Sequence, residues 1–265
     1  MTAGWGRGWR LGLEGGEVGV GEWLGLEGCE VGVGQGMGLE GGGVGAEDGG
    51  MGSDHVVRGA RRDEAGLLGE VLADAFAEDP VFNWLIPPQA RGLEQRRRTF
   101  FTSMSRSYLR RGKPCYLSGG DLAGDAGAAA LWAPPGGWAM PLSQVILEAV
   151  PNGLALRRHL LRGLRTQLQI ERLHAAHSVP HWYLGYLGAR RDQQGQGLGT
   201  QMLREVLDRA DADGVPAYLE SSNERNLTLY QRNGFRVVGE LPALGHGPTI
   251  WRMWREPQPA PPVPG

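Results

Sequence analysis

The clearest hydrophobic pattern lies in the last third of the chain. The segment HWYLGYLGA from His181 is almost continuously apolar, which is typical of a strand covered on both faces. After a glycine-rich loop, apolar residues recur at three- and four-residue spacing from Leu198 to Ala210, which predicts an amphipathic helix ended by Gly214. VPAYLES predicts the next buried strand, NERNLTLYQRNGF a short helix, and FRVVGE and TIWRMWR a closing antiparallel pair.

The preceding part of the chain shows weaker examples of the same strand and helix patterns. DHVVRGA predicts a first strand, DEAGLLGEVLADAFAED predicts an amphipathic helix that Pro80 ends, and residues 93–109 predict a second helix. PCYLS and AGAAALWA predict two more strands, followed by a helical stretch over residues 142–174 with a break at PNG. The order of elements predicts a mixed α/β sheet with helices on both faces.

Composition and charge exclude several classes of protein. The balance of 27 Lys and Arg against 29 Asp and Glu gives no indication of a nucleic-acid partner or a membrane partner. Cys29 and Cys115 are the only cysteines, so we expect no disulfide framework and a cytoplasmic location. No apolar run approaches the roughly 18–20 residues that a membrane span needs.

One folded domain is expected, over residues 53–256. Nearly half of the 45 glycines come before it, most of them in three copies of a repeat of the form LGLEGGEVGVG. Glycine at this density costs more backbone entropy than the few apolar side chains can offset. Residues 1–52 are therefore predicted to be disordered or to lie upstream of the true start at Met51, and the proline-rich residues 257–265 to form a disordered tail.

The loop GQGLG over residues 195–199 lies between a strand and a helix, where a phosphate group can bind. A helix N-terminus presents unsatisfied N–H groups and a partial positive charge, and glycine lets the backbone approach the ligand closely. A Walker loop is excluded because no Lys follows the glycines. A dinucleotide site would use Glu220 as its ribose-binding acid, but too few residues follow for the remaining parallel strands of that fold.

The pattern Gln194-x-x-Gly197-x-Gly199 matches the Q/R-x-x-G-x-G/A signature of the GCN5-related N-acetyltransferases, and residues 181–240 resemble the core of that superfamily, GNAT. The segments QGxGLG, GVPAxLE, RNLxxYxRxGF and W-x-M are most similar to its puromycin N-acetyltransferase-like branch. Arg191 stands where the family often has Pro. The resemblance implies a mostly antiparallel central sheet with a splayed central strand pair, and acetyl-CoA as cosubstrate.

The resemblance also implies cofactor-binding residues. Backbone groups of Leu187, Gly188 and Ala189 would pair with the pantetheine arm. The pyrophosphate would be wrapped by Gln194, Gly195, Gln196, Gly197, Leu198, Gly199 and Thr200. Asn226 and Tyr230, four residues apart on one helical face, would meet the thiol end, with Asn226 contacting the cofactor and Tyr230 acting as the general acid. The alternative for Tyr230 is a core aromatic.

The general base is left open between Glu220, His181 and a water chain. Glu220 is a candidate because a carboxylate at the end of a buried strand needs a reason to be there, although an ion pair would also supply one. Asp79 and Glu78 could hold a substrate ammonium, with a solvated helix end as the alternative. Aromatic and histidine side chains from several elements are predicted to contact the acceptor, with core packing as the alternative: Trp84, Tyr108, Trp132 and His181.

The histidine spacing gives no prediction of a metal site. His174, His177 and His181 follow at three and four residues, but Pro180 breaks the helix between them and neither an acidic residue nor a Cys lies nearby. The predicted function is an acetyl-CoA-dependent N-acetyltransferase that moves an acetyl group to a primary amine of a small molecule by direct attack, working as a monomer or homodimer. The alternatives are a protein lysine or N-terminal acetyltransferase and a non-catalytic acyl-CoA sensor.

Overall fold

The computed structural model describes residues 56–119, 126–138, 150–175 and 179–259, all within one compact unit that spans Gly52–Gly265. The predictions for residues 1–52, for the end of the tail and for the start of the helical stretch at 142 lie outside the described residues. Cys29 and His177 also lie outside them.

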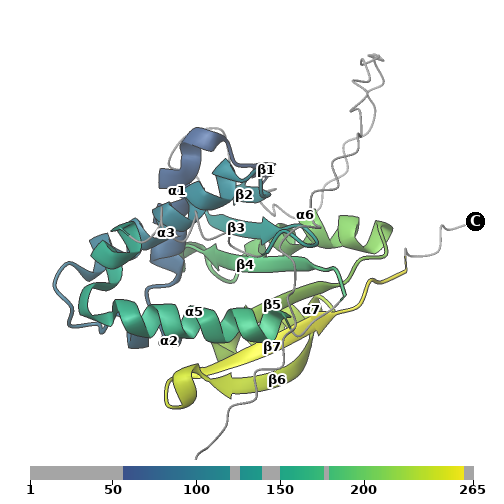
Figure 1. The fold of residues 1–265 in the computed structure, drawn as a ribbon. Coiled ribbons are helices and arrows are strands. Elements are labelled where there is room, and N and C mark those ends of the chain that lie inside the picture. The colour runs from purple at the N-terminus through teal and green to yellow at the C-terminus, as the bar shows by residue number, and fades with distance from the viewer. Residues whose placement is uncertain (1–55, 120–125, 139–149, 176–178, 260–265) are drawn as a thin grey trace, which may run out of the picture. The chain divides into compact units, whose positions relative to one another are not determined.

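A seven-stranded sheet forms the centre of this unit, in the order β1-β2-β3-β4-β5-β7-β6 (Figure 1). Every neighbouring pair is antiparallel except β4 and β5, which are parallel. The predicted mixed, mostly antiparallel sheet is therefore confirmed. The strands are β1 (Val57–Gly59), β2 (Cys115–Ser118), β3 (Ala128–Ala133), β4 (Trp182–Ala189), β5 (Ala217–Ser221), β6 (Arg236–Pro242) and β7 (Thr249–Arg255).

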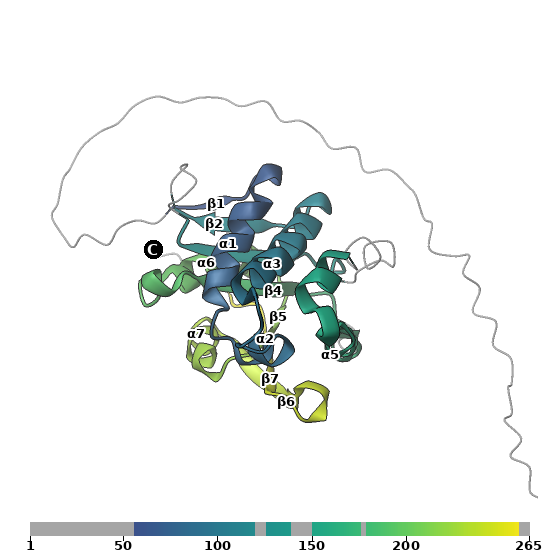
Figure 2. The same ribbon diagram turned by 90° about the vertical axis from the view of Figure 1, so that its left-hand side faces the viewer.

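Helices cover both faces of the sheet, and each face has its own hydrophobic core (Figures 1 and 2). The side chains of β3 alternate between the cores: Trp132 packs with the apolar stripe of α6, while Leu131 packs with α1 and α3. This alternation explains why β3 is buried along its whole length. The helices are α1 (Ala65–Ala75), α2 (Pro80–Leu85), α3 (Leu93–Arg110), α5 (Leu160–Ala175), α6 (Leu198–Ala212) and α7 (Leu227–Arg232).

Two helix boundaries differ from the sequence prediction, and proline is involved in both. Pro80 begins α2 instead of ending α1, and the Asp79 carboxylate caps the new helix by accepting a 2.8 Å hydrogen bond from the Phe82 N–H. Proline is well tolerated in a first helical turn because its missing N–H has no partner there anyway. The predicted break at PNG is wrong, since residues 150–156 are helical and the irregularity falls at Arg157, whose φ is +50°.

The parallel pair β4 and β5 separates soon after it begins. Only Trp182–Leu184 pairs with β5, opposite Ala217–Leu219, although β4 continues to Ala189. On its other edge β4 stays paired with β3 to the end, with a register shift opposite Leu131 and Trp132 that leaves Gly185 as an extra residue. The second half of β4 therefore turns a backbone edge toward the space that opens between β4 and β5, which is the predicted splay.

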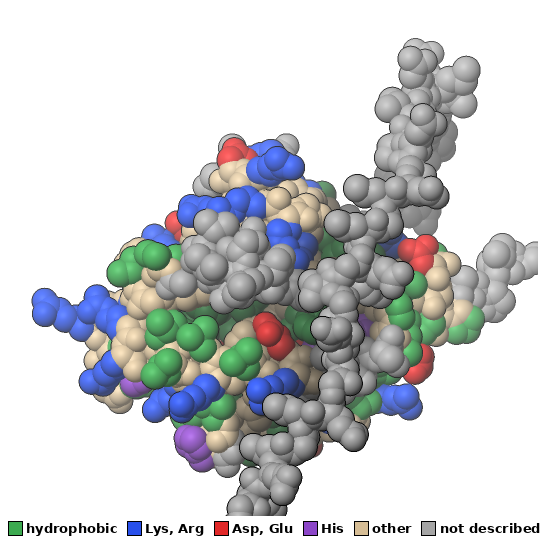
Figure 3. All heavy atoms as spheres, in the orientation of Figure 1, with side chains coloured by type: hydrophobic (Ala, Val, Ile, Leu, Met, Phe, Trp, Pro, Cys, Tyr) green, Lys and Arg blue, Asp and Glu red, His purple; other side chains and the backbone are tan. Residues whose placement is uncertain are grey.

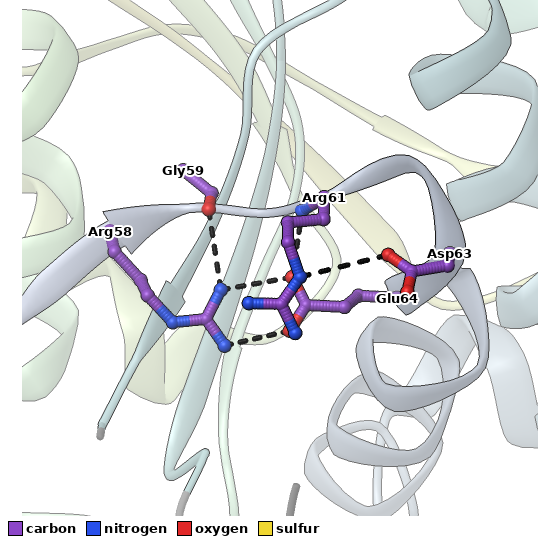
Figure 4. Close-up of polar contacts among 5 residues, drawn as sticks. All are labelled: Arg58, Gly59, Arg61, Asp63 and Glu64. Carbon is purple, nitrogen blue, oxygen red and sulfur yellow. Dashed lines mark hydrogen bonds and ion pairs between the residues drawn. The ribbon is translucent and has the colours of Figure 1, made fainter. Parts of the chain in front are cut away.

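Buried Glu64 ties the first strand to the first helix (Figure 4). Its carboxylate accepts two hydrogen bonds from the Arg58 guanidinium, at 2.7 and 2.9 Å, and one from the Arg61 backbone N–H at 2.7 Å. The Arg61 guanidinium lies 3.0 Å from the same carboxylate. The hydrogen bonds from Arg58 lower the pKa of Glu64 from 4.5 to about 2, with further lowering from Arg61, against the opposing effect of burial.

Glu64→Gln is expected to lower the free energy of unfolding at pH 7 by about 1–2 kcal/mol, because the variant cannot pair with two guanidinium groups. A carboxyl with a depressed folded-state pKa stabilises the fold above its unfolded pKa and loses that contribution as the pH falls. The difference in the free energy of unfolding between variant and wild type should therefore shrink as the pH falls from 4.5 toward 2. Urea unfolding across this range measures it, with exposed Asp63→Asn as the control; equal effects of both variants would contradict the assignment.

Candidate functional site

The glycine loop makes a backbone turn that only glycine adopts easily. Gly195 and Gly197 have φ values of +81° and +82°, and α6 begins directly after them at Leu198. The N–H groups of Thr200 and Gln201 both donate to the Gly197 carbonyl. The N–H groups of Leu198 and Gly199, at the positive end of the helix dipole, have no acceptor within the helix. The turn is thus built to receive an anion.

A cleft of about 610 Å³ opens in front of this turn. Arg191, Arg225 and Arg232 contribute cationic side chains to its walls. Of the predicted cofactor residues, ten line it: Leu187, Gly188, Ala189, Gln194, Gly195, Gly197, Leu198, Gly199, Thr200 and Asn226. Gln196 does not, because it sits exposed between the two left-handed glycines. The contact of Gln196 with the pyrophosphate stays a prediction.

Arg191 attaches the start of the loop to the last turn of α1. Its backbone N–H donates to Asp74 at 2.9 Å, and its guanidinium donates to the same carboxylate at 2.8 and 3.0 Å. Burial raises the pKa of Asp74, but the hydrogen bonds from Arg191 outweigh it and lower the pKa overall. The loop is thereby joined to the last turn of α1, with the guanidinium on Oδ1 of Asp74 and the backbone N–H on Oδ2.

A second, mostly apolar cavity of about 420 Å³ lies between α2, α3, α5 and the separating strands. It meets the first cleft at a shared boundary. Five residues line both spaces: Phe76, Asp79, Leu187, Asn226 and Tyr230. A ligand that extends along the cleft from the glycine turn would therefore present its far end to the apolar cavity at this boundary.

Tyr230, the predicted general acid, lies at the boundary with its ring buried. Burial raises the pKa of its hydroxyl, and the charge of Asp79 raises it further. The phenol therefore stays protonated at neutral pH and can donate a proton to a group that becomes anionic beside it.

Glu220 lies on β5 and faces the apolar cavity. Its Oε1 atom is shielded from solvent and lacks a hydrogen-bond partner among the described residues. Burial raises the pKa of Glu220 from 4.5 to about 7, although the Tyr183 and Tyr218 hydroxyls and the Arg252 charge act in the opposite direction. A carboxyl with this pKa can accept and release a proton near neutral pH.

The four residues predicted to contact the acceptor have different positions. Tyr108 lines the apolar cavity, where its hydroxyl occupies the space that a side chain at Gly185 would need. Trp132 does not line it, because the alternation of β3 directs this ring into the α6 core. Trp84 packs instead against Arg162, 4.8 Å from its ring, and His246. Neither Trp132 nor Trp84 lines this cavity, so the structure does not bring them together with Tyr108.

His181 also lies outside the lining of this cavity. Its Nδ1 lies 2.7 Å from the Val179 carbonyl, and its Nε2 lies 2.7 Å from Nε2 of His174. His174, stacked on Trp138, is the member of this pair that faces the cavity. Among the described residues, no cluster of three or more His, Cys, Asp and Glu side chains is arranged to bind a metal.

Sequence reasoning missed the two arginines that α7 and the turn before it contribute to the cleft. Arg225, Leu229 and Arg232 follow at four- and three-residue spacing and all line it, so helical periodicity around Tyr230 could have found them. Asp79, noted in the sequence as a possible ammonium ligand, lies at the boundary, where Oδ2 accepts a hydrogen bond from the Ser222 hydroxyl.

In the described part of the chain no helix is long and apolar enough to span a membrane.

The comparisons with known proteins agree with this geometry. The model of the Acetyltransferase (GNAT) family matches residues 163–235, which contain β4, the glycine turn, α6, β5 and α7. A crystal structure of a histone acetyltransferase HPA2 and related acetyltransferase from Corynebacterium glutamicum has a TM-score of 0.54 and 25% identity, covering 79% of this chain and 99% of that one. Over residues 163–235 the chain is therefore similar to the GNAT acetyltransferases, and it has the fold of a solved acetyltransferase. Members of this superfamily use acetyl-CoA as acyl donor.

Two curated relatives extend the comparison. An L-methionine sulfoximine/L-methionine sulfone acetyltransferase of Pseudomonas aeruginosa is 41% identical over 65 residues, which is 23% of this chain and only 38% of that protein's length. An uncharacterised N-acetyltransferase of Schizosaccharomyces pombe is 29% identical over 178 residues, covering 62% of this chain and 67% of the relative.

Glu220→Gln is expected to stabilise the protein at pH 8 and to have little effect at pH 4. Because the folded-state pKa is raised to about 7, the folded state holds its proton more tightly than the unfolded chain, and stability falls as the pH rises from 4.5 to 7. The variant should gain up to about 3 kcal/mol at pH 8, measured by urea unfolding. Exposed Glu205→Gln is the control. A destabilised Glu220→Gln at pH 8 would show instead that the carboxylate is paired.

Proposed function

We propose that this protein is an acetyl-CoA-dependent N-acetyltransferase that moves an acetyl group to a primary amine of a small molecule by direct attack. The observation that carries the proposal is the meeting of two cavities at Tyr230. One leads to an anion-binding turn, and the other is faced by a carboxyl with a pKa of about 7.

The cofactor would lie along the cleft. The N–H groups of Leu198 and Gly199, with the arginines of the wall, suit the pyrophosphate of coenzyme A. The edge of β4 from Leu187 to Ala189, which β5 does not pair, suits the amide groups of the pantetheine arm as an added strand. The acetyl thioester then reaches the boundary beside Asn226 and Tyr230.

The chemistry needs one base and one acid. Glu220 takes a proton from the substrate ammonium, so that the neutral amine nitrogen can attack the thioester carbonyl. As the carbon–sulfur bond breaks, the electron pair leaves with sulfur and the Tyr230 hydroxyl donates its proton to the thiolate. After the attack the nitrogen carries one proton too many, and this second proton passes through water to the Tyr230 phenolate. The first proton, which Glu220 took from the ammonium, goes to solvent.

Three considerations favour a small-molecule enzyme over the alternatives. An apolar cavity of about 420 Å³ suits a small acceptor better than a peptide segment, whose backbone groups would stay unpaired there. A non-catalytic sensor has no use for both an acid at the boundary and a base in the adjoining cavity. The relative from Pseudomonas is named for acetylation of a small molecule, in line with the same assignment.

The segments QGQGLG and RNLTLYQRNGF favour the puromycin N-acetyltransferase-like branch as a finer placement.

Gly197→Glu is expected to weaken acetyl-CoA binding by about 100-fold or more, because bulk and negative charge would displace the pyrophosphate from its N–H donors. Isothermal titration calorimetry measures the affinity. Gly214→Glu is a matched control: Gly214 lies just beyond the other end of α6, also has positive φ, +66°, and also has open space around its Cβ position. Equal loss of affinity in both variants would attribute the effect to strain and refute the site.

Tyr230→Phe is expected to lower kcat by about 100-fold while leaving acetyl-CoA affinity within about twofold, because the ring stays and only the proton donor is lost. Release of free thiol under saturating substrates measures kcat. Tyr116→Phe, at a half-buried tyrosine that lines neither cavity, serves as the control. Unchanged kcat in Tyr230→Phe would remove Tyr230 from the reaction.

A further inference from the structure

The charges around the acceptor cavity are unequal in sign. Three acidic residues line it: Asp79, Glu171 and Glu220. Among the described residues that line it, the Lys113 ammonium is the only cation apart from the titratable His174, and the lining contains no arginine. Lys113 is buried and lies 4.6 Å from the centre of the Tyr108 ring. His174 has its Nε2 directed at His181, 2.7 Å away.

This arrangement suits an ammonium group and opposes a carboxylate. Protein sites that recognise a free carboxylate commonly offer a bidentate arginine, which the described lining of this cavity does not supply. Near the boundary a substrate carboxylate would instead lie close to Asp79 and Glu220, both acidic and shielded from solvent. Like charges in a poorly solvated site repel strongly. The part of the cavity near Asp79 and Glu220 therefore favours amines without a carboxylate over amino acids.

The wall that α5 contributes to the cavity also reaches an apolar part of the surface. Leu160, Leu164 and Leu168 follow at four-residue spacing and line the cavity, and Leu164 and Leu168 are also 42% and 51% exposed. Figure 3 shows hydrophobic side chains gathered along this helix, with basic side chains beside them. Because these leucines line the cavity and are also partly exposed, they form an apolar entrance to it. A ligand with an apolar body would cover this exposed apolar surface.

We infer that the acceptor is an amine that carries an apolar body and no carboxylate. Its ammonium lies between Asp79 and Glu220, and its body extends along α5 toward Leu164 and Leu168. This inference rests on the proposed function but goes beyond it, because the acyltransferase reaction would proceed equally with an amino-acid acceptor. It also separates this protein from the relative that is named for methionine derivatives, which carry a carboxylate.

Three acceptors of matched shape test the charge argument: phenethylamine, L-phenylalanine and L-phenylalanine amide. With wild-type protein at pH 8 and saturating acetyl-CoA, kcat/KM from thiol release should be at least about 100-fold higher for phenethylamine and the amide than for L-phenylalanine. Equal values for L-phenylalanine and its amide would overturn the inference while leaving the proposed function intact. Failure to bind acetyl-CoA, measured separately by calorimetry, would overturn the proposed function itself.

A series of unbranched alkylamines from ethyl to octyl tests the apolar path. Each methylene that enters the path should raise kcat/KM about three- to fourfold. Leu168→Gln should flatten this rise, while Leu161→Gln should not, because Leu161 is exposed on the same helix and does not line the cavity. A rise that both variants leave unchanged, or no rise in wild type, would overturn the assignment of the path to α5.

Discussion

The early end of the pairing between β4 and β5 is the constraint on which the rest of this structure depends. Three residues of each strand pair, and then the strands separate while β4 stays hydrogen-bonded to β3. Backbone groups cannot be left unpaired in a dry interior without a large cost in free energy. The separation is therefore stable only because the space is a solvent-accessible cleft on one side and a cavity on the other, and both are open to ligands.

Carboxyl and hydroxyl groups in different parts of the fold are held at different protonation states by their surroundings. Asp74 and Glu64, paired with arginines, stay ionised far below neutral pH. Glu220, shielded by apolar walls, titrates near neutral pH, and Tyr230 keeps its proton. Carboxyl groups with cationic partners are thus held ionised, while a buried carboxyl without such close pairing has its pKa raised toward neutral pH.

Most of the fold and the cofactor half of the site could be predicted from the sequence, because both depend on local patterns. Glycines with positive φ, a helix that begins at Leu198, and Asn226 and Tyr230 on one helical face are all visible in short segments. The acceptor half could not be predicted in the same way. In β3 every residue is apolar, so alternation alone does not reveal that Trp132 faces α6. The pairing of His181 with His174 likewise depends on how α5 returns to the sheet.

The extra residue at Gly185 determines what the acceptor cavity is made of. Before it, Trp182 and Leu184 face the α6 core, and after it Leu187 does, so the side-chain alternation changes phase within one strand. Tyr183 and Tyr186, an odd number of positions apart, can therefore both face the cavity. Without the extra residue, the side chains from Tyr186 to Ala189 would exchange the two faces of the sheet. One glycine in the middle of β4 therefore decides which side chains form the wall of the cavity and which belong to the core.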